Sequence, residues 1–109
     1  MNRRSLMASL AIASGLFATS LVPTPALADE ALAKARMCLA CHAVDRKVGI
    51  GPAFRDVATK YASDKNAQIK LAAKIRNGSS GVWGRAPMPA NPKVTEAEAV
   101  ALAAWVLSR

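Results

Sequence analysis

The 109-residue sequence is poor in aromatic residues, cysteine and histidine. It holds two tryptophans, two phenylalanines, one tyrosine, two cysteines and a single histidine. Two cysteines allow at most one disulfide, so this is not a disulfide-dense secreted scaffold. Six prolines, six glycines and a 52% apolar content exclude collagen-like, low-complexity and disordered classes. The apolar excess is mostly alanine, and no stretch shows strand-like alternation, so the chain reads as one all-α domain.

The N-terminus lacks a clean apolar run of the ~20 residues that a membrane span requires. Residues 6–22 are apolar but diluted by serine, threonine and glycine, and Arg3 and Arg4 precede them. Ala26 and Ala28 then offer the small residues that a signal peptidase reads. The pattern predicts a secretory signal peptide over residues 1–28, cut after Ala28.

Other readings of this N-terminus stay open. A membrane anchor is the competing interpretation of the apolar run. The paired arginines also resemble a twin-arginine signal, so the export route is undetermined. No cysteine directly follows the predicted cut, so a lipoprotein anchor is not indicated.

The remaining chain, residues 29–109, is an 81-residue domain with thirteen basic and seven acidic residues, a net charge of +6. A domain this small buries only about 60–65% of its unfolded surface, so its core needs help from a bound group. Helices are expected over 29–37, running on into Cys38, and over 54–61 and 67–76. Thr95 and Glu98 form a capping box that begins a last helix reaching the C-terminus.

Two long loops separate these four short helices. Residues 47–52 contain two glycines and a proline, and residues 78–92 contain three glycines and three prolines. A loop as long as the second is usually functional in a compact domain. The expected buried side of the last helix holds Val94, Leu102, Trp105 and Val106.

Residues 38–42 read Cys-Leu-Ala-Cys-His, the C-x-x-C-H attachment motif of c-type haem. Residues three and four apart lie on one face of a helical turn. Cys38 and Cys41 can therefore form thioethers with the two vinyl groups of one porphyrin edge. His42 follows directly and would bind the iron. The motif predicts one covalently bound haem c.

Three other sites could use the same residues. A thioredoxin-type redox motif normally accompanies a βαβ pattern, which is not evident here. A zinc site lacks a fourth ligand, because no further cysteine or histidine exists. A plain structural disulfide is the third alternative. The predicted export favours haem, because haem is attached to such motifs after export.

The sixth iron ligand follows by elimination. His42 is the only histidine, so ligation by two histidines is excluded. Met37 directly precedes Cys38 and cannot reach the opposite face of the ring. Met88 lies between Pro87 and Pro89, which stiffen the backbone and could hold a thioether in place. The alternative is that Met88 only fills the core. Histidine–methionine ligation raises the reduction potential and leaves no open position for a substrate.

The chain from Asp29 to Arg109 resembles a small bacterial class I monohaem cytochrome c of the short c-five-fifty-one or c-eight type. The resemblance rests on the order and spacing of the C-x-x-C-H motif with five further segments. These segments are Val48–Pro52, Ile75–Gly78, Gly81–Gly84, Pro87–Pro89 and Trp105–Leu107.

The resemblance implies further roles around the haem. The backbone carbonyl near Pro52 would accept a hydrogen bond from the His42 ring. Trp83 would donate its indole N–H to a haem propionate, with Lys74 or Arg76 nearby. The ordinary alternatives are that Trp83 is a core aromatic and that the two basic residues are a solvated helix end.

Asn91 would approach the Met88 sulfur, unless it is simply a turn residue. The sequence departs from the family where a glycine usually precedes the first cysteine, because Met37 stands there. An aromatic residue usual one turn earlier is also missing. We therefore expect Leu32 and Met37 to pack against Trp105 in a rearranged contact between the first and last helices.

These features together predict a monomeric periplasmic electron carrier that is not an enzyme. It would take one electron from a donor such as a membrane cytochrome complex and pass it to a nitrite-reductase-like enzyme or an oxidase. The net charge of +6 favours acidic redox partners, and its scatter over the chain argues against nucleic acid. The enzymatic alternative is a haem peroxidase or ligand-binding haem protein with a labile sixth ligand.

Overall fold

The computed structural model describes residues 27–109, so nearly all of the predicted signal peptide lies outside the described residues. The described part is helical, as predicted, and contains no strand beyond one antiparallel bridge between Ser79 and Met88. None of the helices in this part is long and apolar enough to cross a membrane. The elements are α1 (Glu30–Ala35), the 3₁₀ turn η1 (Cys38–Ala40), α2 (Phe54–Lys60), α3 (Ala67–Asn77) and α4 (Glu96–Leu107).

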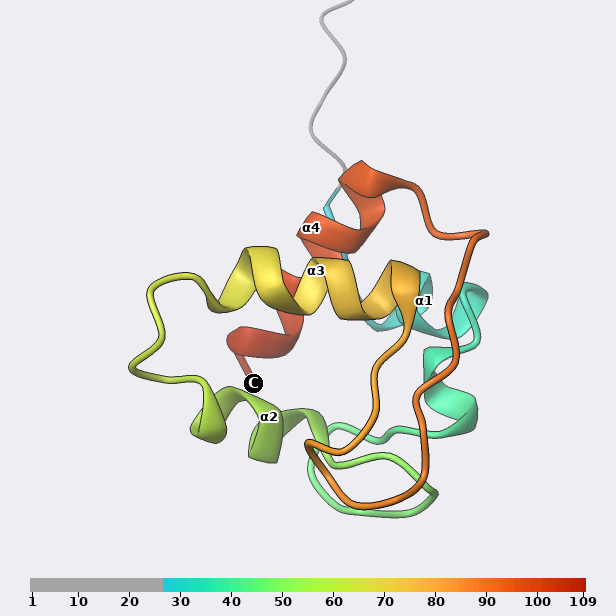
Figure 1. Ribbon diagram of the computed structural model, residues 1–109. Coiled ribbons are helices and arrows are strands. Elements are labelled where there is room, and N and C mark those ends of the chain that lie inside the picture. The colour runs from blue at the N-terminus through green and yellow to red at the C-terminus, as the bar shows by residue number, and fades with distance from the viewer. Residues whose placement is uncertain (1–26) are drawn as a thin grey trace, which may run out of the picture.

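Helix α4 is the centre of the packing, because both α2 and α3 lie against it (Figure 1). Three of the four residues predicted on its buried side are buried, namely Val94, Leu102 and Val106. The fourth, Trp105, is half-buried and packs against the same core. Two loops, 41–53 and 78–95, extend from this core. The first begins with Cys41 and His42 of the haem motif, and the second contains the Pro-Met-Pro segment.

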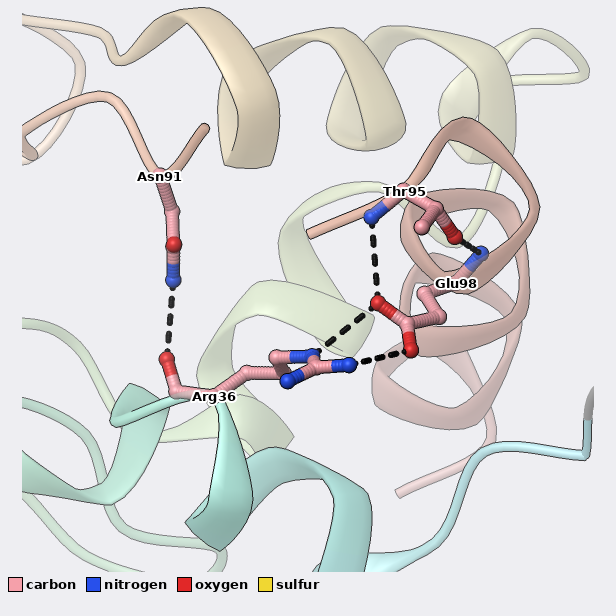
Figure 2. Close-up of polar contacts among 4 residues, drawn as sticks. All are labelled: Arg36, Asn91, Thr95 and Glu98. Atoms are coloured by element: carbon pink, nitrogen blue, oxygen red, sulfur yellow. Dashed lines mark hydrogen bonds and ion pairs between the residues drawn. The ribbon is translucent and has the colours of Figure 1, made fainter. Parts of the chain in front are cut away.

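The predicted capping box of α4 is present and is part of a larger polar contact (Figure 2). The Glu98 backbone N–H donates to Thr95 Oγ1 at 3.1 Å, and the Thr95 N–H donates to Glu98 Oε2 at 3.0 Å. The same carboxylate accepts two bonds from the Arg36 guanidinium, at 3.0 and 2.7 Å. Arg36 is the C-cap of α1, so this bidentate ion pair ties the first helix to the start of the last.

The first helix is shorter than predicted and does not run into Cys38. It ends at Ala35, and Met37 has the left-handed conformation with φ +63°. A left-handed residue cannot continue a right-handed helix, so η1 begins separately at Cys38. The reversal also turns the Met37 side chain to solvent, where it is 71% exposed. The predicted packing of Met37 against Trp105 is therefore wrong, whereas Leu32 does pack against the core.

Candidate functional site

A largely apolar cavity of about 290 Å³ lies between the two loops and the inner faces of α2, α3 and α4. Cys38, Cys41, His42 and Met88 all line it, although Met88 comes from a loop far along the chain. The helices contribute an apolar wall made of Phe54, Val57, Tyr61, Leu71, Ile75, Leu102, Ala103 and Val106. The fold therefore gathers both predicted iron ligands and both predicted attachment cysteines around one apolar space.

The imidazole of His42 is fixed by one short hydrogen bond. Its Nδ1 lies 2.7 Å from the Pro52 carbonyl oxygen, the contact that the family resemblance implies. A carbonyl oxygen can only accept, so Nδ1 carries the ring proton and donates it. The lone pair of Nε2 is then free for a metal. This tautomer and orientation are what a metal-binding histidine requires, and the bond also raises the basicity of the ligand.

The His42 ring is also held by two neighbours whose roles the sequence had not indicated. Phe54, the first residue of α2, stacks on it with ring centroids 5.0 Å apart and planes 21° apart. Phe54 in turn meets Trp105 of α4 edge-on at 5.4 Å. Gly51 lies so close that a Cβ there would come within 2.5–2.9 Å of three ring atoms. Gly51 belongs to the Val48–Pro52 segment that carries the family resemblance. Only the folded chain reveals that its missing side chain makes room for the ring.

Both thiols are free and half-buried at the cavity wall. Burial raises the pKa of the Cys38 thiol above its ordinary value. Its Sγ lies 4.0 Å from the carbonyl oxygen of Arg36. Two separate thiols next to a metal-ready imidazole fit the attachment of one porphyrin edge better than a disulfide.

Met88 is held at the cavity by the backbone of its loop. The Ser79 N–H donates to Met88 O at 3.0 Å, and the Met88 N–H donates back to Ser79 O at 2.8 Å. Gly78 permits this pairing, because its φ is +79° and a Cβ there would meet Met88 O at 2.7 Å. The end of α3 and the Pro-Met-Pro segment are thus brought together by a residue that must be glycine.

Besides Pro52, the resemblance implies roles for four residues, and the structure places them differently. Trp83 and Lys74 line the cavity, as a contact with a propionate requires. Arg76 is exposed on the last turn of α3. The Asn91 amide Nδ2 donates to Arg36 O at 2.8 Å (Figure 2). An approach of Asn91 to the Met88 sulfur would therefore use the second N–H of the same amide.

Comparison with known proteins agrees with this geometry. The family model for cytochrome c matches residues 29–109. Cytochrome c-552 of Nitrosomonas europaea is 53% identical over 96 residues, covering 86% of this chain and 92% of that relative. Cytochrome c-551 of Stutzerimonas stutzeri is 55% identical over 91 residues, covering 82% and 86%. The crystal structure of wild-type Nitrosomonas europaea cytochrome c552 superposes with a TM-score of 0.71 at 54% identity, covering 73% of this chain and 98% of that chain.

The apolar cavity, the two thiols on its wall and the free Nε2 of His42 fit a covalently attached haem. The match to the cytochrome c family and the identity to its short members confirm one haem c, bound through Cys38 and Cys41. The protein is accordingly a small electron-carrier haem protein of the all-α class I type. The chain belongs to the cytochrome c family.

Proposed function

We propose that residues 29–109 form a soluble periplasmic one-electron carrier whose iron has His42 and Met88 as axial ligands. Residues 1–28 would be the signal peptide removed on export. One observation carries the ligand assignment: the cavity that holds the haem-attachment cysteines is lined by His42 and Met88, which come from segments far apart in the chain. The start of the family match at residue 29 supports the same division of the chain.

Held by Cys38, Cys41, His42 and Met88, the haem would supply a one-electron ferric/ferrous couple. The chain's own residues supply orientation and environment. The Pro52 carbonyl holds the ring proton of His42, and Phe54 and Gly51 define the plane of the ring. The Ser79 pairing fixes the backbone that presents Met88. Apolar residues of α2, α3 and α4 keep water from the cavity and thereby favour the less charged, ferrous form.

Second-sphere roles and partners complete the proposal. Trp83, with Lys74 or Arg76, would bind a propionate, and Asn91 would approach the Met88 sulfur. The donor would be a membrane cytochrome complex or a soluble protein, and the acceptor a nitrite-reductase-like enzyme or an oxidase. The charge of +6 on residues 29–109 supports acidic partners, and the scatter of the basic residues over the chain argues against a nucleic-acid role. The carrier would act as a monomer.

An absorption spectrum of the purified ferric and ferrous protein tests the proposal. Sharp α and β bands on reduction would identify a low-spin c-type haem, whereas a high-spin spectrum would favour a peroxidase. In Met88→Ala the haem should stay covalently attached, while the ferric iron becomes high-spin or takes an outside ligand. The reduction potential should fall, because the thioether favours ferrous iron.

Met37→Ala is the matched control, because Met37 is exposed and the left-handed turn keeps its side chain away from the core. Its spectrum and potential should equal those of the unmodified protein. An unchanged low-spin spectrum and potential in Met88→Ala would show that another residue is the ligand.

A further inference from the structure

The long loop between α3 and α4 has an outer part, residues 80–87, that we call the arm. Figure 1 shows that this loop runs away from the end of α3, turns, and returns to the start of α4. Every residue of the arm is exposed. Within residues 27–109, the arm takes part in none of the backbone hydrogen bonds recorded outside the helices. Gly81 and Gly84 have φ of +82° and +116°, and a Cβ on either would meet open space.

A cation–π contact joins this arm to α2. Lys60 Nζ lies over the Trp83 ring, 5.4 Å from its centroid. That distance is within the range of a cation–π interaction, and tryptophan is the most favourable ring for it. Lys60 is the last residue of α2, while Trp83 lies midway along the arm and lines the haem cavity. The contact therefore spans from α2 to the rim of the cavity.

Helix α2 consequently touches both ligand-bearing segments. Its first residue, Phe54, stacks on His42. Its last residue, Lys60, holds the arm that leads directly into Met88. At the base of the arm, the Ser79–Met88 pairing consists of two backbone hydrogen bonds. Because the arm runs directly into Met88, a movement of the Met88 backbone would carry the arm with it.

We propose that Lys60 is a positioning residue for the sixth ligand: by holding Trp83 at the cavity rim, it keeps the arm closed and Met88 directed into the cavity. The inference rests on the proposed ligation by Met88. Lys60 itself touches neither the cavity nor a ligand, and it acts through the Trp83 ring. A cation–π contact at an exposed site shifts an opening equilibrium by about two- to five-fold.

The test uses the ferric holoprotein and imidazole as an outside ligand. At saturating imidazole the binding rate is limited by loss of Met88, that is, by opening of the arm. We expect Lys60→Gln to bind imidazole about two- to five-fold faster than the unmodified protein. Lys60→Arg should restore the slow rate, because a guanidinium also binds an aromatic face. Lys65→Gln is the charge-matched control on the exposed turn that follows α2, and its rate should not change.

Two measurements separate this role from a general loss of stability. The urea midpoints of Lys60→Gln and Lys65→Gln should agree. Trp83→Leu should accelerate imidazole binding as Lys60→Gln does, and the double variant should be no faster than either single one. Equal imidazole rates in Lys60→Gln and Lys65→Gln would overturn the proposal. Fully additive effects of Lys60→Gln and Trp83→Leu on the imidazole rate would also overturn it.

A nuclear magnetic resonance spectrum of the ferrous protein keeps this outcome distinct from failure of the ligand assignment. The ring current of Trp83 should shift the Lys60 side-chain protons, and Trp83→Leu should abolish that shift. If the shift is present but Lys60→Gln binds imidazole at the normal rate, the positioning role is wrong and Met88 ligation stands. If Met88→Ala leaves the imidazole rate unchanged, the ligand assignment itself fails.

Discussion

Gly51 and His42 are packed so closely that no side chain fits between them. A Cβ on Gly51 would lie 2.5 Å from Cε1, 2.6 Å from Nδ1 and 2.9 Å from Nε2 of the ring. The same ring is held from other directions by the Pro52 carbonyl and by Phe54. The imidazole is therefore confined by Gly51, the Pro52 carbonyl and Phe54, and it has little room to yield toward them.

Gly51→Ala should accordingly displace the His42 ring and disturb its bond to the iron. We expect an altered Soret and α-band spectrum and a loss of about 1–3 kcal/mol in the free energy of unfolding, typical of overpacking. Gly81→Ala is the control, because its φ is positive but its Cβ meets open space. It should cost about 1 kcal/mol through backbone strain alone and leave the spectrum unchanged. A normal spectrum in Gly51→Ala would contradict the close packing.

Met37→Gly should stabilise the protein. Met37 adopts a left-handed conformation and exposes most of its side chain, so glycine removes strain and forfeits little packing. The greater entropy of glycine in the unfolded chain offsets part of this gain, so we expect up to about 1 kcal/mol in urea unfolding of the holoprotein. Ala35→Gly, at the end of α1, should instead destabilise by roughly 0.5–1 kcal/mol. Equal losses in both variants would show that Met37 is not strained.

The Arg36–Glu98 pair should make stability depend on pH. The hydrogen bonds from Arg36, followed by the Thr95 N–H, hold the pKa of the Glu98 carboxyl below its usual value. A carboxylate with a lowered folded-state pKa stabilises the fold fully above its unfolded pKa of ~4.3. That contribution is lost as pH falls through the lower, folded-state value.

Glu98→Gln should therefore be less stable than the unmodified protein at pH 7, and the difference should shrink as pH drops below about 4. Thermal unfolding across this range is the measurement. Glu96→Gln removes an exposed first-turn carboxylate of the same helix that is outside the Arg36 pair. It should show a smaller difference at pH 7. If Glu98→Gln is less stable than the unmodified protein by the same amount at low pH, the charge of Glu98 is not the cause of the difference.

The charge of residues 29–109 leads to a prediction about electron transfer. A positive surface steers a carrier toward acidic partners, and this steering is screened beyond about 8–10 Å at physiological salt. Bimolecular electron transfer to the physiological partner should slow clearly as salt rises from ~10 mM to a few hundred mM. Reduction by an uncharged small molecule should not change over the same range. A flat or rising rate with the partner would indicate an apolar docking face or a basic partner.

The sequence predicted those parts of the fold that depend on local spacing. Helices α2 and α3 lie within about a residue of their expected bounds, because apolar side chains at helical spacing and the turns around them are local signals. The capping box was readable for the same reason, since Thr95 and Glu98 are three residues apart. The haem motif is five consecutive residues and needed no fold to be recognised.

Features that depend on distant segments were not visible. The left-handed turn falls on Met37, a residue type that does not itself favour that conformation, and only the glycine usual there in the family pointed to it. Arg36 and Glu98 are separated by 62 residues, and only docking of α1 on α4 brings them together. The stacking of Phe54 on His42 likewise depends on how a loop directs the start of α2. Such contacts form only when distant segments pack together, and a one-dimensional pattern does not encode them.

The contact between Asn91 and the Arg36 carbonyl also bears on loop-closure entropy. It joins positions 55 residues apart, and Asn91 lies only three residues beyond Met88. With that junction made, a displaced Met88 remains tethered by a very short segment instead of a free chain of many tens of residues. The entropic cost of returning Met88 to the cavity grows with the logarithm of the length of the loop that must close, and the Asn91 contact has already closed that loop. Under the proposed ligation the Met88 thioether would keep a high effective concentration at the cavity, so its loss and recovery would be a local exchange that leaves the helical core folded.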